Sequence, residues 1–135
     1  LVFAFQYRNY ENADSSRYLQ VVKFGRSESV MAMIEFGGVL RIVDTTSARL
    51  VHTIAMGGMP VGLLVSGGAV YVADGDDVVV IDASTARVVT RTAIGRPVSC
   101  LAVSHDGTHL YVGDFDGSVT ALPVQSAGLG LRAAS

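Results

Sequence analysis

The chain has 135 residues, of which 50% are hydrophobic and 16% are charged, and its net charge at pH 7 is −2. An acidic balance without a run of Lys or Arg provides no footprint for phosphates, so we expect no nucleic-acid partner. No apolar run has the length of a membrane span, so no transmembrane segment is predicted. Cys100 is the single cysteine, which excludes an internal disulfide, and its apolar surroundings predict a buried side chain.

The first part of the chain predicts one isolated strand and then a unit of four. Residues 1–8 have the character of a strand without a unit of its own, and residues 9–16 that of a polar loop. The first unit covers about 17–56, with strands expected at 17–24, 29–36, 39–43 and 49–56. Short apolar runs between turn residues, without a helical period, indicate strands rather than helices.

The second and third units repeat this organisation. The second covers about 61–94, with strands expected at 61–66, 69–74, 78–83 and 87–94. The third covers about 98–133, with strands expected at 98–104, 109–114 and 118–124. Its fourth strand is weak because glycines interrupt residues 127–131.

Internal repetition identifies the units as blades of a β-propeller. Residues 39–54 and 78–93 are near copies, and Tyr71 and Tyr111 occupy matching strands as packing residues. Strands such as Val78–Ile81 are apolar on both faces, which suits a sheet that is covered on both sides. Units of four strands repeating at this spacing are typical of propeller blades. We therefore predict an all-β fold, with about three four-stranded antiparallel blades in a single domain over residues 1–135.

The residues also resemble the YVTN-type β-propeller repeat over roughly 29–124. The resemblance rests on Asp82-Ala-Ser-Thr-Ala-Arg-Val-Val89, Ile94-Gly-Arg-Pro97, Ala102-Val-Ser-His-Asp-Gly107 and Leu110-Tyr-Val-Gly-Asp114. Relatives in that family include surface proteins, scaffolds and some enzymes. The resemblance is compatible with an extracytoplasmic or cell-surface location, and the sequence leaves the compartment open. Ala121-Leu-Pro-Val124 departs from the Val-Ile-Asp ending of the repeat, which suggests a terminal blade.

Three blades are too few for a closed ring, which requires at least four. An uncovered blade face of ~300 Å² would cost about 7 kcal/mol at ~25 cal/mol per Å². Two chains could associate head to tail, with residues 1–8 completing the partner's last blade. The chain could instead belong to a longer propeller, or a different protein could supply the remaining blades. The sequence leaves these three arrangements open.

Acidic residues gather where the second-to-third-strand turns and the inter-blade crossings meet. Alternate turns of an antiparallel meander fall on opposite edges of the sheet, so these residues share one propeller face. We name this set the acidic rim: Glu35, Asp74, Asp76, Asp77, Asp114 and Asp116, with Arg96 beside it. The rim is the predicted ligand-binding site. Carboxylates of this kind can hold Ca²⁺ or a cationic ligand, but Asp and Gly are also what hairpin turns select. No cofactor is therefore predicted, with Ca²⁺ kept as the alternative.

The sequence contains no convincing catalytic constellation. His105 and His109 flank a turn without a third metal ligand, and the adjacent residues Ser104-His105-Asp106 cannot form a hydrolase relay. We therefore predict a non-enzymatic module that binds a ligand or a protein on one propeller face. Two alternatives stay open. The first is a propeller enzyme of the lyase, lactonase or quinone-dependent dehydrogenase type with an axial pocket, and the second is a structural assembly subunit.

Overall fold

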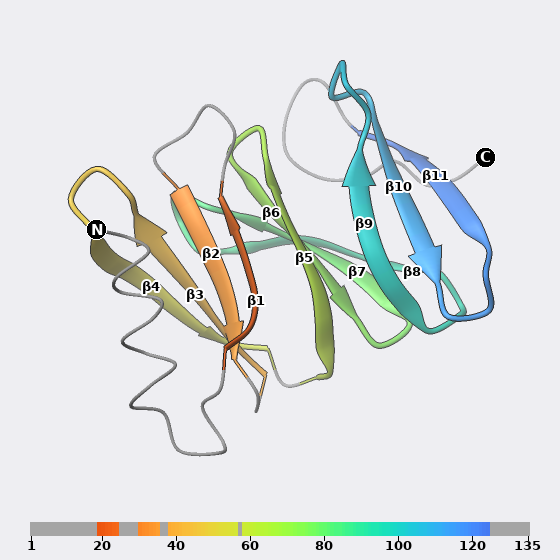
Figure 1. Ribbon diagram of the computed structural model, residues 1–135, viewed down its shortest axis with the longest axis horizontal. Helices are drawn as coiled ribbons and strands as arrows, with labels where there is room; N and C mark the ends of the chain where they lie inside the picture. Colours follow the sequence, from red (N-terminus) through yellow and green to blue (C-terminus); the bar gives the residue numbers. More distant parts are fainter. Residues whose placement is uncertain (1–18, 25–29, 36–37, 57, 125–135) are drawn as a thin grey trace.

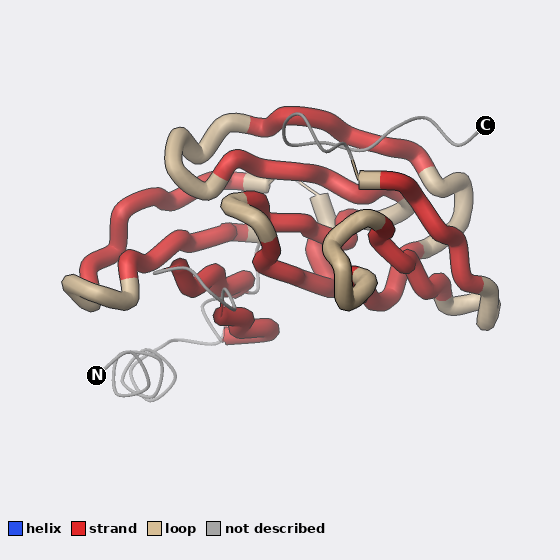
Figure 2. Tube along the Cα trace, turned by 90° about the horizontal axis from the view of Figure 1, so that it is seen from above, coloured by secondary structure: helices blue, strands red, loops and turns tan. Residues whose placement is uncertain are grey.

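The computed structural model describes residues 19–24, 30–35, 38–56 and 58–124, and every regular element among them is a β-strand (Figures 1 and 2). Blade 1 contains β1 (Leu19–Phe24), β2 (Val30–Glu35), β3 (Val39–Asp44) and β4 (Arg49–Ala55). Blade 2 contains β5 (Pro60–Ser66), β6 (Ala69–Asp74), β7 (Asp77–Asp82) and β8 (Val88–Ala93). Blade 3 contains β9 (Val98–Val103), β10 (His109–Asp114) and β11 (Val119–Pro123).

Each blade is an antiparallel meander in which strands that follow one another in the chain are neighbours in the sheet. Strands β6 and β10 begin and end where the sequence predicted. Strand β7 runs from Asp77 to Asp82, one residue earlier than expected, because Asp74 pairs with Asp77 across a tight turn at Gly75 and Asp76. The expected strand at 1–8 and the weak fourth strand of the third unit lie outside the described residues. Within those residues, no helix is long and apolar enough to cross a membrane.

The three blades lie side by side, with their first strands next to one another (Figure 1). Strand β5 contacts both β1 and β9. Since sheets with a shared twist pack face to face, this order places the first strands on the inner side of the stack and β4 and β8 on the outer side. The arrangement is that of consecutive propeller blades, and it confirms the predicted fold class.

Blade 2 is buried on both faces, as its continuous apolar strands predicted. One face packs against blade 1 through Val70, Val72, Val79 and Ile81, which meet Ala32, Ile34, Leu40 and Ile42. The other face packs against blade 3, where Ala69, Tyr71, Ala73, Val78 and Val80 meet Val98, Leu110, Val112 and Leu122. All six residues of β6 are buried. Burial of these side chains is the main stabilising term of the stack.

The two end blades differ in their outward faces. On blade 1, Met31, Met33 and Val43 face away from blade 2 and are nevertheless buried. On blade 3, Tyr111 is 41% exposed and Val119 71%. The open face also carries Cys100, so the prediction of a buried cysteine is wrong. Its strand alternates between the core and an outward face that no described residue covers.

Candidate functional site

The acidic rim lies at the edge of the sheets where β6 turns into β7, where β10 turns into β11, and where the chain crosses between blades. Glu35 ends β2 at the same edge, but its side chain lies outside the described residues. The other rim residues fall into two groups that differ in burial and in hydrogen bonding.

Asp74 and Asp77 share one arginine, which the sequence analysis did not identify. Arg91, on β8, donates to Asp77 Oδ2 at 2.9 Å and to Asp74 Oδ2 at 3.2 Å. The hydrogen bond to Asp77 and then the contacts with Asp74 raise the pKa of Arg91, against the opposing effect of desolvation. The side chain of Asp74 is only 3% exposed, and its Oδ1 has no hydrogen-bond partner. The register could have revealed this arginine, because Asp77 faces Ala93, two residues from Arg91.

Asp114 is the counterpart of Asp74 in blade 3, and its carboxylate likewise stabilises the fold through an ion pair and hydrogen bonds. Its Oδ2 lies 3.1 Å from Nε of Arg96 in the preceding crossing. Its Oδ1 accepts hydrogen bonds from the backbone N–H groups of Asp116 and Ser118, at 2.9 and 3.0 Å. Arg96 also donates to Thr120 Oγ1 at 3.3 Å. The carboxylate therefore closes its own turn and attaches the crossing to blade 3.

Asp76 and Asp116 are exposed at the tips of their turns. Among the residues that the structure describes, no three His, Cys, Asp or Glu side chains form a group that could hold a metal ion. Ca²⁺ requires at least six oxygen ligands, and the buried carboxylates of the rim are already engaged by arginines. The described carboxylates of the rim therefore do not form an ion cage.

Two large apolar side chains share this face with the exposed carboxylates. Met59, in the crossing before β5, is 74% exposed, and Phe115, in the turn after β10, is 70% exposed. Backbone hydrogen bonds connect the crossings and turns in a row: Gly75 N to Met59 O at 3.3 Å, Val98 N to Gly75 O at 2.9 Å, and Phe115 N to Pro97 O at 2.9 Å. We name this surface, with Met59, Asp76, Phe115 and Asp116 on it, the rim face.

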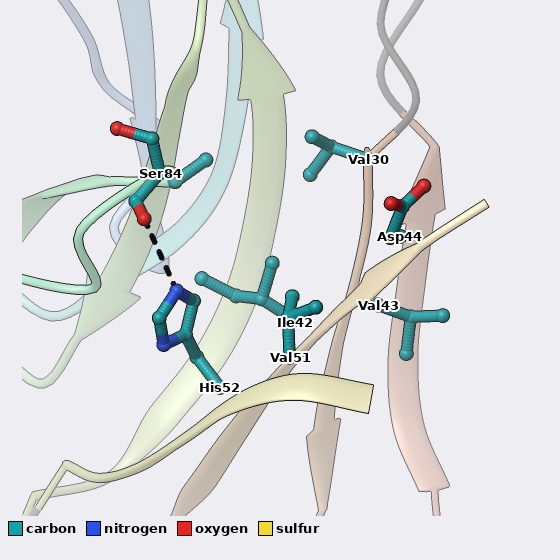
Figure 3. Close-up of a pocket in the computed structure, with 8 residues that line it drawn as sticks. Val30, Ile42, Val43, Asp44, Val51, His52 and Ser84 are labelled. Atoms are coloured by element: carbon teal, nitrogen blue, oxygen red, sulfur yellow. Dashed lines mark hydrogen bonds between the residues drawn. The ribbon is translucent and has the colours of Figure 1, made fainter. Parts of the chain in front are cut away.

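A pocket of about 240 Å³ lies on the opposite edge, between blades 1 and 2 (Figure 3). Its lining consists of Val30, Ile42, Val43, Asp44, Val51, His52, Ala83 and Ser84. Nε2 of His52 lies 3.2 Å from the carbonyl oxygen of Ser84, so the ring joins the two blades. No candidate residue predicted from the sequence lines this pocket. It could have been suspected because His52 stands where the repeat has Thr90 in blade 2.

The turn between β9 and β10 contains the two histidines weighed as metal ligands. Here Asp106 accepts hydrogen bonds from Ser104 Oγ and Thr108 Oγ1, both at 2.7 Å, and from Thr108 N at 3.1 Å. The Thr108 hydroxyl, the Ser104 hydroxyl and the Thr108 N–H lower the pKa of Asp106 to about 2. His109 Nδ1 contacts the Thr108 hydroxyl at 2.8 Å, and His105 is exposed. The segment is a hydrogen-bonded hairpin, and its aspartate is used to close the turn.

Comparison with known proteins supports the fold of the chain and does not identify its function. No family model matches the chain. A seven-bladed β-propeller protein of Mycobacterium tuberculosis is 35% identical over 99 residues, which cover 68% of this chain and 24% of that relative. The chain therefore spans about a quarter of the curated relative it matches.

Solved structures with the same fold include hydrazine synthase of Kuenenia stuttgartiensis, with a TM-score of 0.72 and 17% identity, covering 88% of this chain and 36% of that one. A chain of the mitotic checkpoint complex has a TM-score of 0.70 and 14% identity, covering 86% and 38% respectively. These identities are low enough that the likeness concerns the fold alone. Together with the blade geometry, the comparisons establish that this chain is built of β-propeller blades.

Proposed function

We propose that the chain is a non-enzymatic interaction module that binds a protein partner on the rim face. The observation that carries this proposal is the exposure of Met59 and Phe115 on the same face as Asp76 and Asp116. Interfaces typically combine apolar anchors of this kind with a polar surround. Isolated exposed apolar residues are common, but here two large ones lie on one edge of adjacent blades.

The rigidity of the rim face supports binding without rearrangement. Met59 and Phe115 belong to segments that neighbouring segments hold through backbone hydrogen bonds, and Arg96 ties its crossing to the buried Asp114. A surface that is ordered before binding loses less conformational entropy when the partner arrives. The crossings and turns of the rim face are therefore suited to a preformed contact.

The charge of the rim face specifies the partner's chemistry. Asp74, Asp77 and Asp114 are paired with arginines, whereas Asp76 and Asp116 remain exposed beside the apolar anchors. A complementary partner carries Lys or Arg around an apolar centre. Exposed charges of this kind mainly raise the association rate, so binding should weaken as salt is added.

A phage-displayed library of random peptides, selected on the intact chain, tests the proposal. We expect the enriched peptides to combine Lys or Arg with apolar residues. Their affinity should fall about tenfold or more for Phe115→Ser and for Met59→Ser, since each removes one anchor. The double variant Asp76→Asn/Asp116→Asn should mainly slow association.

Matched controls are Val88→Ser and Val89→Ser, which remove exposed apolar side chains from the outer strand β8. Peptides that bind these control variants weakly and the rim variants normally would place the interaction outside the rim face. A selection that enriches acidic peptides would also contradict the proposal.

A further inference from the structure

The pocket between blades 1 and 2 lies on the edge of the sheets opposite the rim face (Figure 3). His52 and Ser84 stand on one side of it. Val30 and Asp44 stand on the other side, with Ile42 between the two sides. Blades 1 and 2 both contribute to the lining, so the pocket requires neither blade 3 nor any further blade.

Most of the side chains that line the pocket are apolar, namely those of Val30, Ile42, Val43, Val51 and Ala83. Ile42 and Ala83 are buried, whereas Val51 is 49% exposed, so the pocket has an apolar floor and one wall in contact with solvent. An apolar cavity of about 150 Å³ is large enough to bind benzene. The pocket volume of about 240 Å³ therefore suits an apolar body of about ten non-hydrogen atoms.

The residues that shape the pocket are not those of the repeat. By the strand registers, His52 of blade 1 corresponds to Thr90 of blade 2, and Ala83 of blade 2 corresponds to Val124 of blade 3. Val124 packs against the core between blades 2 and 3. A valine thus stands at the later junction where the pocket has the smaller alanine. The pocket is a property of one junction rather than of every blade.

Asp44 provides the charge of the pocket. Its Oδ1 accepts a hydrogen bond from the backbone N–H of Thr46 at 2.9 Å. Asp74, Asp77 and Asp114 are paired with arginines, whereas Asp44 forms no ion pair within the part of the chain that the structure describes. Since a carboxylate can accept several hydrogen bonds, its Oδ2 is available to a ligand.

The side-chain donors of the described lining are already engaged. Nε2 of His52 lies 3.2 Å from the carbonyl oxygen of Ser84, and because that oxygen can only accept, Nε2 carries the proton. The hydroxyl of Ser84 donates to Asp82 Oδ1 at 2.7 Å. The polar groups left to a ligand, above all the Asp44 carboxylate, therefore accept hydrogen bonds. Such a lining favours a cation and disfavours an anion.

We infer that this pocket binds a small organic cation, in which one ammonium group is attached to an apolar body of about ten non-hydrogen atoms. The ammonium group donates to Asp44, and the apolar body lies against Ile42 and Ala83. Arg49 faces Asp44 in the register of the hairpin but forms no ion pair with it in the described structure, so the ligand supplies the charge partner. This inference is independent of the proposed function, which concerns the rim face.

Three probes of similar size and different charge test the inference on the full 135-residue chain. They are 2-phenylethylamine, which is protonated at neutral pH, the neutral 2-phenylethanol and the anionic phenylacetate. Each is titrated while the amide signals of Asp44, His52 and Ser84 are followed by ¹H–¹⁵N NMR. We expect the amine to shift these signals with a Kd of about 1 mM or tighter. The alcohol should bind about fivefold more weakly or worse, and phenylacetate more weakly still.

Asp44→Asn keeps an oxygen for the N–H of Thr46 and removes the charge, so the amine and the alcohol should then bind equally. The matched control is Asp106→Asn, because Asp106 also accepts a backbone N–H in a turn on the same edge but lies in blade 3. This control should leave the preference for the amine unchanged. Equal binding of the amine and the alcohol to the wild type, or tighter binding of phenylacetate, would overturn the inference.

Two further variants test whether the pocket itself is the binding site. Ala83→Leu fills the floor and should weaken amine binding about tenfold or more. Because Ala83 is buried, Val51→Lys provides the same test at the exposed wall, where the new ammonium group competes for Asp44. Amine binding that persists in Val51→Lys, or that shifts signals away from the pocket alone, would contradict the assignment to this site.

Discussion

At the scale of single residues, aspartates that are close in the sequence perform different tasks because the backbone buries them differently. Asp74 ends a fully buried strand and its carboxylate meets Arg91, whereas Asp76, two residues later, stands at the tip of a turn in solvent. A carboxylate can leave water only if a charged partner or several N–H groups replace its hydration. The buried carboxylates Asp74 and Asp114 are therefore the ones paired with arginines, whereas Asp76 and Asp116 keep their contact with solvent.

Asp106 makes a prediction about pH. Its pKa falls from the usual 3.8 to about 2, first because the hydroxyl of Thr108 donates to it. A carboxyl group whose pKa is lower in the folded than in the unfolded state stabilises the fold at pH values above its unfolded-state pKa. That contribution is lost as the pH falls through the folded-state pKa of about 2. The difference in unfolding free energy between the wild type and Asp106→Asn should thus shrink below pH 3.8.

The substitution Thr108→Val removes the largest cause and should move the Asp106 pKa back toward 3.8, as followed by NMR titration of the carboxyl carbon. His105→Ala is the control, since His105 is exposed and makes no contribution to that pKa. An unchanged titration in Thr108→Val would show that the hydroxyl does not hold the carboxylate.

Ala86 makes a prediction about backbone strain. Its φ is 61°, and its repeat counterpart Ala48 has a φ of 57°, so both alanines adopt the left-handed conformation that glycine tolerates better. Ala86→Gly should relieve the strain of the left-handed conformation, while the greater freedom of glycine in the unfolded chain opposes part of that gain. The net effect should be a rise of about 0.5–1 kcal/mol in the free energy of unfolding. Urea denaturation measures the change. Ala93→Gly, in extended backbone at the end of β8, should instead destabilise the protein.

At the scale of elements, the crossings between blades are fitted closely to the strand ends beside them. The crossing before β5 brings Gly58 against the carboxylate of Asp74, and the crossing before β9 brings Arg96 to Asp114. Hairpins depend mainly on local turn residues, but a crossing must meet a strand that lies later in the chain. Its side chains therefore respond to tertiary packing.

Gly58 makes a prediction at this scale. A Cβ on Gly58 would lie 2.7 Å from the carboxyl carbon of Asp74, whose side chain is buried and held by Arg91. Gly58→Ala should therefore destabilise the protein by about 1–3 kcal/mol, as other overpacked sites do. In an Asp74→Ala background the same substitution should cost much less, and a double-mutant cycle in urea measures the difference. Equal costs in both backgrounds would show that the clash is not with Asp74.

At the scale of the whole molecule, the stack is asymmetric. Blade 2 is buried on both faces and the outward side chains of blade 1 are buried too, but the outward face of blade 3 is open. The sequence indicated that an uncovered face at either end would be costly, and the outward side chains Met31 and Met33 of blade 1 are indeed buried. Within the described residues, exposed apolar side chains on an outward blade face are therefore found on blade 3.

Tyr71 and Tyr111 make a matched prediction about this asymmetry. They occupy the same repeat position, but Tyr71 is 3% exposed between two blades and Tyr111 is 41% exposed on the open face. Tyr71→Ala should cost about 3–5 kcal/mol of unfolding free energy, and Tyr111→Ala less than about 1 kcal/mol. Thermal and urea unfolding of both variants measure the costs. Similar costs would mean that the face of blade 3 is covered in solution.

Local patterns in the sequence were sufficient for the strands, the repeat and the fold class. Alternation, apolar runs and Asp-Gly turns depend on neighbours within a few residues, so β6 and β10 could be delimited to the residue. The placement of the rim aspartates in turns and at strand ends followed from the same local signals. Their function as a ligand site remains a prediction.

Tertiary structure decided which of those residues are available. The pairing of Arg91 with Asp74 and Asp77, the burial of Asp114, the pocket beside His52 and the exposure of Cys100 all depend on which sheet faces which. A strand pattern places side chains on two faces of a sheet but does not say which face another blade covers. That choice follows from the stacking of blades, a contact between segments tens of residues apart, and so only the assembled structure reveals it.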